Sequence, residues 1–481
     1  MFDTPIAPDG IELGMRDVQT IADADVIEGY LTDASNTTGH AERLALPKNT
    51  SEVSAVVRHC QREGIPLTVT AQRTSTTGGP VPHGGWLLST EKLNRIHAAD
   101  DVDAGVILGV HQAELAQQGL LFPPDPTSKN ECTIGAAIAC NASGARSFRY
   151  GPTRSWIEAV EWVRPTGEAQ WIDRNSPLPD DWPRVQWVEP GVKTAAGFFP
   201  ADNLLDLVIG SEGALGIVTR AKLRLVPAPL DVLGLIVFFP SEADAIDFVN
   251  TARTGAARRG SPAAEGALNP VALEYFDHDA LRLAGDRIPD LPSDARAALF
   301  IEIEHEGDPP IDQWWSAICD SGALADDTIV ADDATGRRRL HTLRHAIPAA
   351  VNETVVANGM PKVGTDFAVP DGALVPIMAA YAAVTLPKIC FGHIGDNHLH
   401  LNLLPRNAEE LSQARVIYRE LALEAVRLGG TVSAEHGIGK IKRALLAEMV
   451  GPDIIGSFST LKAHIDPNWV LGRGTMLSPP N

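Results

Sequence analysis

The segment PPDPTSKNECTIGAAIACNASGARSFRYG, residues 123–151, decides the expected fold because it is a long run of mainly small and hydroxyl-bearing residues. Similar segments lie on both sides of it, QRTSTTGGPVP at 72–82 and IGSEGALGIVT at 209–219. Small residues let backbone N–H groups approach a ligand, and nearby hydroxyls suit the pyrophosphate of a dinucleotide. None of the three matches GxxxxGK[ST] or GxGxxG. A tight turn explains each loop alone, but three in succession favour a large cofactor.

Short helices and strands are expected around these loops. Apolar residues recur at helical spacing from Val53 to Cys60, after a cap at Thr50 or Ser51. Three further segments are typical of strands: IPLTVT (65–70), GWLLST (85–90) and the hairpin EAVEWVRPTGEAQWI (158–172). The character of the chain changes near Pro227. Beyond it we expect a helix in SEADAIDFVNTARTGAARR (241–259) and a buried strand in ALFIEIEHE (298–306). The predicted domains are therefore 1–227 and 228–440, followed by a C-terminal segment, 441–481, that packs back on the first domain.

A second informative segment is CFGHIGDNHLHLNLLP, residues 390–405, which holds three of the 14 histidines within eight positions. Read as a strand, it places His398, His400 and Asn402 on one face and leucines on the other. A turn at Gly395-Asp396 could bring His393 back towards the polar face. A half-exposed sheet with incidental histidines is the simpler interpretation. The clustering instead favours a functional site.

The overall composition is that of a globular protein. The formal net charge of −21 argues against nucleic acid and anionic membranes as partners. The five cysteines form no CxxC pair, which indicates neither an iron–sulfur cluster nor a disulfide framework. No apolar run approaches the ~18 residues of a membrane span, and the N-terminus is acidic where a secretory signal would be basic. We expect a cytoplasmic protein without a transmembrane segment.

The three loops, in this order and together with ALPKNTSEVSAVV (45–57), resemble the FAD-binding domain of the vanillyl-alcohol-oxidase superfamily. GHIGDNHLHLNL (392–403), GGTVSAEHGIGK (429–440) and HIDPNWVLGRG (464–474) are similar to its D-2-hydroxyacid dehydrogenase branch. That branch contains D-lactate dehydrogenases, D-2-hydroxyglutarate dehydrogenases and the flavin subunit of glycolate oxidase. The resemblance spans about residues 43–475. It implies an α+β fold: a two-subdomain FAD-binding domain and a cap domain with an antiparallel sheet and flanking helices.

The resemblance also implies which residues act. Non-covalent FAD would be bound by Thr74, Ser75, Thr77, Gly78, Gly79, Pro124, Asp125, Thr133, Gly135, Asn141, Ser143, Gly144, Tyr150, Gly151, Glu212, Gly216 and Ile217. A divalent metal, most plausibly zinc, would be held by His393, His400 and Glu435, with His436 as the base. The substrate, a small 2-hydroxy acid, would contact Arg344, Lys362 and Asn402. Apart from the resemblance, a chain without an iron–sulfur cluster suggests a quinone, an electron-transfer flavoprotein or a dye-like molecule as the electron acceptor. A homodimer is the expected oligomer.

The chain departs from the family pattern at three places. Ala71 and Gln72 replace two glycines expected before the first double glycine. In the metal motif, usually GHxGDGNxH, Asn397 and His398 replace the second glycine and the asparagine. We expect His398 to hold a metal ligand in place without binding the ion; an added ligand and an ordinary strand residue are the alternatives. Pro348 stands where a threonine is sometimes found, which leaves the substrate's chain length open.

Two other functions are compatible with parts of the sequence. A zinc hydrolase would use the His/Glu cluster to activate water, but would leave the three glycine-rich loops without a role. A redox-inactive FAD-binding protein would explain the loops. The Glu435-His436 pair argues against that second alternative.

Overall fold

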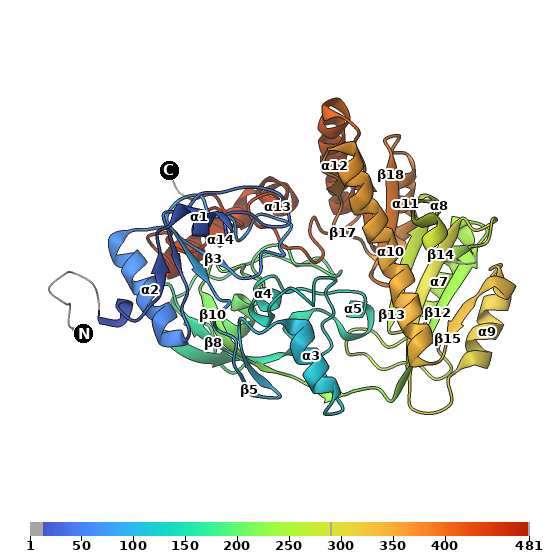
Figure 1. Cartoon of the computed structure of the whole chain (residues 1–481), viewed down its shortest axis with the longest axis horizontal. Helices are drawn as coiled ribbons and strands as arrows, with labels where there is room; N and C mark the ends of the chain where they lie inside the picture. The colour runs from blue at the N-terminus through green and yellow to red at the C-terminus, as the bar shows by residue number, and fades with distance from the viewer. Residues whose placement is uncertain (1–12, 289–290, 480–481) are drawn as a thin grey trace.

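The computed structural model describes residues 13–288 and 291–479 and has two lobes (Figure 1). The first lobe contains two main sheets. One has the strand order β1 (Thr20–Ile21), β2 (Arg43–Ala45), β4 (Trp86–Ser89) and β3 (Leu67–Thr70), in which β2, β4 and β3 run parallel. The other is antiparallel, with the order β5 (Ile96–Ala98), β6 (Asp101–Asp103), β10 (Ile217–Leu223), β8 (Ile157–Val163) and β9 (Ala169–Asp173). The predicted strands and the β8–β9 hairpin are confirmed.

Helices connect and cover these sheets. The remaining elements of this lobe are α1 (Ala24–Glu28), α2 (Thr50–Glu63), α3 (Leu108–Ala116), α4 (Ile134–Ala139), α5 (Ser147–Tyr150), α6 (Leu204–Val208) and the strand pair β7 (Leu120–Leu121) with β11 (Val226–Pro227). The predicted cap of α2 at Thr50 or Ser51 is wrong. Asn49 caps the helix, because its side chain accepts a hydrogen bond from the Glu52 N–H and asparagine is at least as good a cap as serine or threonine.

The second lobe is built on one antiparallel sheet. Its order is β15 (Ile329–Ala331), β12 (Asp231–Phe239), β14 (Ala297–His305), β13 (Ala272–Asp277), β18 (Lys388–His393), β19 (His398–Leu403) and β16 (Val363–Gly364), and β17 (Phe367–Ala368) also pairs with β19. In β12, Leu233, Leu235 and Val237 alternate with Ile236 and Phe238 in two separate cores. Both faces of the sheet are therefore covered.

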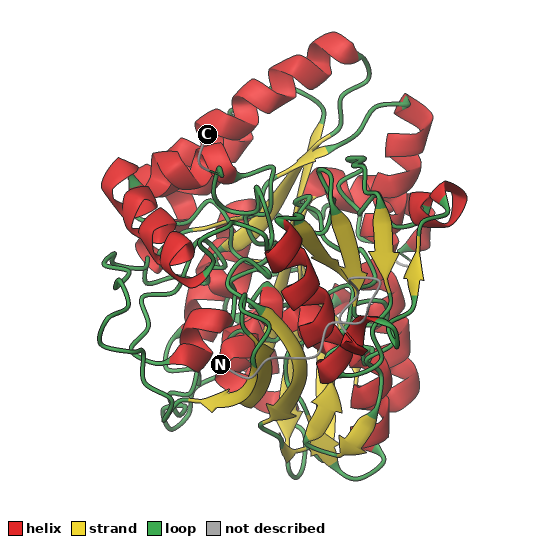
Figure 2. Ribbon diagram, turned by 90° about the vertical axis from the view of Figure 1, so that its left-hand side faces the viewer, coloured by secondary structure: helices red, strands yellow, loops and turns green. Residues whose placement is uncertain are grey.

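Each face has its own helices, and Figure 2 shows helices on both sides of the strands. On one face lie α7 (Glu242–Arg253), α9 (Ile311–Cys319), α11 (Leu374–Ala382) and α12 (Ala408–Arg427), and on the other α8 (His278–Ala284) and α10 (Ala334–Asn358). The helix predicted over 241–259 ends early, at Arg253. Gly255, two residues later, has φ +71°, which an α-helix cannot contain.

The C-terminal helices α13 (Arg443–Val450) and α14 (Pro452–Ile465) return to the first lobe (Figure 1). The Leu67 N–H donates to the Val470 carbonyl at 2.8 Å, and the Gly472 N–H donates to the Leu67 carbonyl at 3.0 Å. The N-terminal and C-terminal parts of the chain therefore form the first lobe together. No helix among the described residues is long and apolar enough to cross a bilayer.

Candidate active site between the two lobes

One cavity of about 1380 Å³ brings the glycine-rich loops and the histidine cluster together. Among the predicted residues, its wall contains Thr74, Ser75, Gly79, Gly135, Ser143, Glu212, Gly216, Ile217, Arg344, Lys362, His393, His400, Asn402, Glu435 and His436. The volume exceeds the roughly 300–1,000 Å³ of typical small-ligand pockets. Small residues and hydroxyls dominate the loop side of the wall, which fits a dinucleotide cofactor with room for a substrate beside it.

Other residues predicted to bind the cofactor hold the loops in shape. They are Thr77, Gly78, Pro124, Asp125, Thr133, Asn141, Gly144, Tyr150 and Gly151, none of which is among the described residues of the cavity wall. Thr133 caps α4 by accepting from the Ala136 N–H, and the Gly78 N–H donates to Asp33 at 2.9 Å. A side chain at Gly144 would place its Cβ 1.8 Å from the Asp125 carbonyl oxygen. Their direct contact with a cofactor stays a prediction.

The remaining loop residues make similar contacts. The Pro124 carbonyl accepts from Gln112 at 2.8 Å, and Asp125 pairs with Lys129 at 2.6 Å. The carbonyl of Thr77 accepts from the N–H groups of Lys440 and Ile441, which ties the first loop to the C-terminal region. Asn141 Oδ1 accepts from the Arg154 N–H at 2.9 Å, Tyr150 donates to Glu304 at 2.5 Å, and the Gly151 N–H donates to the Ser147 carbonyl at 2.8 Å. These contacts make the cavity wall a fixed surface.

Four potential metal ligands meet at one edge of the cavity. His393 ends β18, and the turn at Ile394–Asp396 brings it opposite His398 at the start of β19. Ligand atoms of His393, His398, His400 and Glu435 all lie within 4.8 Å of one another. Two ligands of a tetrahedral zinc ion, each at about 2.1 Å, would be about 3.4 Å apart. The donors would therefore have to move closer together to bind one ion.

Neighbouring groups fix the direction of two of these rings. The Nδ1 atom of His393 lies 2.5 Å from Glu274 Oε1, and His400 Nδ1 is 2.9 Å from the Thr365 carbonyl, to which it donates. Their Nε2 atoms lie 3.5 and 3.6 Å from Glu435 Oε1. A partner that holds the far nitrogen in this way is usual for metal-binding histidines. The donor set fits a divalent ion.

Electrostatics support the same conclusion. Burial opposes the charged form of His393, but the Glu274 carboxylate outweighs it and raises the pKa of His393 to about 9. Burial also opposes the charged form of Glu435, yet Lys193 and the histidines hold its pKa well below the ordinary value. The cluster is thus arranged around a negative carboxylate that attracts positive charge. A metal ion would supply that charge and displace the imidazole proton.

His436 lies beside the donor cluster. Its Nε2 is 3.6 Å from Glu435 Oε1 and its Nδ1 is 3.4 Å from Asp366 Oδ2, while its ring stacks on His400 with centroids 5.5 Å apart. Burial lowers the pKa of His436 to about 4, against the opposing effect of Asp366. The ring is therefore neutral at physiological pH, and the same shift makes it a weaker base than a free imidazole.

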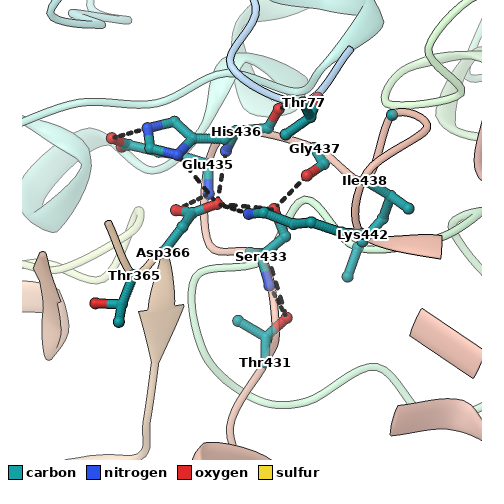
Figure 3. Close-up of polar contacts among 12 residues, drawn as sticks. Thr77, Thr365, Asp366, Thr431, Ser433, Glu435, His436, Gly437, Ile438 and Lys442 are labelled. Atoms are coloured by element: carbon teal, nitrogen blue, oxygen red, sulfur yellow. Dashed lines mark hydrogen bonds and ion pairs between the residues drawn. The ribbon is translucent and has the colours of Figure 1, made fainter. Parts of the chain in front are cut away.

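Asp366 organises the loop that carries these residues (Figure 3). Its carboxylate accepts from the backbone N–H of Glu435 at 3.2 Å and of His436 at 3.1 Å, from Ser433 Oγ at 2.8 Å and from Lys442 Nζ at 2.7 Å. Burial raises the pKa of this carboxyl, but His436, Lys442 and His398 beside it outweigh burial and hold the pKa well below its ordinary value. Asp366 was not among the predicted site residues.

Lys193 was also missed. Its ammonium donates to Glu435 Oε2 at 2.8 Å, and its side chain is 2% exposed. It lies in an irregular segment of the first lobe, far from Glu435 in sequence. A charged residue between small ones, in PGVKTAAG (190–197), was the available signal. A lysine so deeply buried requires a partner, which only the folded chain identifies.

The predicted substrate residues all reach the cavity, but they differ in what they contact. Arg344 donates to Glu274 Oε2 at 3.1 Å, so the same carboxylate supports Arg344 and His393. Lys362 lies on the cavity wall, where removal from bulk water lowers its pKa. Asn402 donates to the His400 carbonyl at 3.1 Å. Two cations therefore lie along the cavity wall that leads to the donor cluster.

Comparisons with known proteins agree with this arrangement. Residues 41–173 match the FAD binding domain, and residues 235–476 match the C-terminal domain of FAD linked oxidases. D-lactate dehydrogenase of Anaerostipes hadrus is 30% identical over 90% of this chain and 89% of its own. Glycolate oxidase subunit GlcD of Bacillus subtilis is 29% identical over 91% and 89%, and D-2-hydroxyglutarate dehydrogenase of Xanthomonas citri pv. viticola is 29% identical over 90% and 88%.

A solved structure of alkyldihydroxyacetonephosphate synthase aligns with 94% of this chain and 82% of its own, with a TM-score of 0.65 at 16% identity. This likeness concerns the fold alone, and it confirms the predicted fold class. The family matches extend over both lobes, and the more similar relatives align along nearly the whole chain. The protein is therefore a member of the FAD-linked oxidase family, an oxidoreductase with an FAD-binding domain.

Proposed function

We propose that this enzyme oxidises a D-2-hydroxy acid to the corresponding 2-oxo acid, using non-covalent FAD and a divalent ion, most plausibly zinc. The observation that carries the proposal is the single cavity whose wall contains the cofactor loops, the His/Glu donors and two cations, Arg344 and Lys362. The names of the relatives, D-lactate dehydrogenase and D-2-hydroxyglutarate dehydrogenase, support this substrate class.

Different residues of the chain would bind the substrate and accept its proton. Arg344 and Lys362 would bind the substrate carboxylate, with the guanidinium better suited to a bidentate contact. His436 would accept the hydroxyl proton at a ring nitrogen, while the hydrogen on Cα leaves as hydride and the C=O bond forms. When bound, FAD supplies the hydride acceptor, and a divalent ion on the donor cluster supplies Lewis acidity.

The two alternatives from the sequence fit the cavity less well. A zinc hydrolase has no use for the loops at 71–76 and 211–217, which line the same cavity as the donors. A redox-inactive flavin-binding protein has no use for His436, whose neutral ring lies beside Glu435. We further propose a quinone or an electron-transfer flavoprotein as the electron acceptor.

The test is anaerobic mixing of the purified yellow protein with a panel of D- and L-2-hydroxy acids, read as bleaching of the flavin absorbance. We expect at least one D acid to bleach the flavin and its L enantiomer to be much slower. Acid precipitation of the same sample should leave the flavin in solution. A flavoprotein that no member of the panel reduces would contradict the proposal, as would protein that cannot be loaded with FAD.

A further inference from the structure

His398 is a buried histidine whose Nδ1 atom has no hydrogen-bond partner among the described residues. Its side chain is 0% exposed, and within the described residues neither ring nitrogen makes a well-oriented hydrogen bond. Leaving a buried polar group without a partner costs roughly 1–3 kcal/mol. Such a group in a native structure calls for an explanation, and an unseen ion is one of the established ones.

The orientation of the ring agrees with an ion as the missing partner. The Nδ1 atom of His398 lies 3.9 Å from Glu435 Oε2, on the side of the donor cluster. The Nε2 atom lies 2.9 Å from Asp366 Oδ1. A carboxylate beside Nε2 favours the tautomer that has its proton there, and this leaves the lone pair of Nδ1 directed at the cluster.

The backbone turn keeps this ring in register despite two departures from the family motif. Asn397 stands where the motif has glycine and has φ +51°, a left-handed conformation that asparagine tolerates. Its side chain donates to Asp371 at 2.7 Å and accepts from Arg253 at 2.5 Å. The turn is therefore preserved, and the histidine that replaces the motif's asparagine points at the same site as His393 and His400.

We propose that His398 binds the metal directly through Nδ1, as a fourth protein ligand supported by Asp366. This differs from the supporting role that the sequence favoured. It rests on the metal centre of the proposed function, but on neither the substrate nor the flavin chemistry. Three imidazoles and one carboxylate would hold the ion more tightly than two imidazoles and one carboxylate. They would fill the four positions of a tetrahedral zinc ion, so a substrate oxygen would bind it as a fifth ligand.

The test counts imidazoles around the ion. X-ray absorption at the zinc edge of the flavin-loaded, zinc-loaded protein should show three imidazole ligands in the unmodified enzyme. His398→Asn, which restores the family's residue, should show two. Zinc affinity measured against a chromophoric chelator should also fall, but the imidazole count decides, because loss of a residue that only supports a ligand lowers affinity by roughly 10–100-fold too. The matched control, His345→Asn, changes a histidine of the same cavity wall that lies outside the donor cluster and should alter neither quantity.

The measurement on the unmodified protein decides the question even if the variant fails to fold. Two imidazoles there, or equal imidazole counts in the unmodified enzyme and His398→Asn, would overturn the proposal. Protein that binds no zinc would overturn both this inference and the proposed metal centre. Failure of every hydroxy acid to bleach the flavin, with three imidazoles present, would overturn the proposed substrate class and support this inference.

Discussion

His436 is placed to act on a substrate that binds between the flavin loops and the donor cluster. Its ring borders the cavity, and burial keeps it neutral. We predict that His436→Ala lowers the anaerobic rate of flavin reduction by about 10²–10⁴-fold, the usual contribution of a positioned base. FAD content and metal content should stay close to those of the unmodified enzyme, since its side chain belongs to neither predicted set of ligands.

The control for this prediction is His345→Ala. His345 borders the same cavity, but its Nδ1 donates to the His341 carbonyl one helical turn earlier, at 2.6 Å. Its loss should change the rate little. A His436→Ala enzyme that reduces its flavin at the unmodified rate would exclude His436 as the base.

The metal ligands and the flavin loops are different residues, so the two groups should be separable. We predict that dialysis against a strong chelator removes the metal and most of the activity but leaves the ratio of FAD to protein unchanged. Adding zinc back should restore activity. Metal analysis and the flavin spectrum of the same sample check this, and the release of FAD together with the metal would show that one site depends on the other.

Residue identities were predictable where the sequence is periodic or follows a motif, and not elsewhere. The alternation of His398, His400 and Asn402 with leucines gave the polar face of β19 correctly. Lys193 and Asp366 had no such pattern. Their roles come from contacts to Glu435 and His436, which are distant in sequence and meet only after the lobes have formed.

At the scale of an element, the loop after His436 depends on a contact from the first lobe. Glu212, in the third glycine-rich loop, accepts from the Ile438 N–H at 2.7 Å and from the Gly439 N–H at 2.8 Å. Gly437 has φ +78°, and a Cβ there would lie 2.9 Å from Glu212 Cδ, so both sides of the contact are close-packed. The carboxylate therefore connects the cofactor loop to the loop that carries Glu435 and His436.

This contact should make stability depend on pH. Burial, only partly offset by the two backbone donors, raises the pKa of Glu212 to about 7, above the value of ~4.3 expected in the unfolded chain. The folded state favours the protonated carboxyl of Glu212. The stability that this carboxyl contributes is therefore fully present below pH ~4.3 and is lost as the pH rises through about 7. The loss is at most about 4 kcal/mol, and less because the side chain is partly exposed to the cavity.

Glu212→Gln tests this prediction because glutamine imitates the protonated form. Denaturant unfolding of the flavin-loaded proteins between pH 5 and 8 should show the unmodified enzyme losing stability relative to the variant as the pH rises. If the free energies of unfolding of the two proteins change equally with pH over this range, the raised pKa of Glu212 is contradicted.

Elements were predicted better than their ends. The strands of the first lobe and β14 follow from alternating or continuous apolar residues. The end of α7 at Arg253 was missed, because Ala256 and Ala257 continue an apparently helical composition beyond Gly255. The order of the strands in the large sheet could not be read from the chain, since β18 and β19 pair beside β13, from far earlier in the sequence.

At the scale of the whole molecule, buried polar contacts join the two lobes beside the cavity. Arg146, just before α5 in the first lobe, donates to Glu302 on β14 of the second at 3.0 Å, and the other oxygen of Glu302 lies 3.0 Å from His341. The Arg146 and Glu302 side chains are 21% and 6% exposed. Because both side chains are largely buried, the pair behaves as an internal ion pair and not as a surface one.

We predict that Arg146→Met destabilises the enzyme by about 3–5 kcal/mol, because it leaves the buried Glu302 carboxylate without its guanidinium partner. Arg146→Met combined with Glu302→Gln should recover much of that loss, since neither partner is then charged. The exposed pair Arg419–Glu448, with side chains 58% and 30% exposed, is the control and should contribute no more than about 1 kcal/mol. Denaturant unfolding of the four proteins of each cycle gives the two coupling energies.

The same ion pair should make the folded protein less stable in acid. Burial opposes the ionised form of Glu302, but Arg146 outweighs it, so the folded-state pKa lies well below the ordinary value. The resulting stability is present above the unfolded-state pKa of ~4.3 and is lost as the pH falls towards the folded-state value. Glu302→Gln should therefore flatten acid unfolding below pH ~4.3. Equal acid sensitivity in the two proteins, or equal coupling energies for the buried and exposed pairs, would mean that the lobes are held together by apolar packing and not by this ion pair.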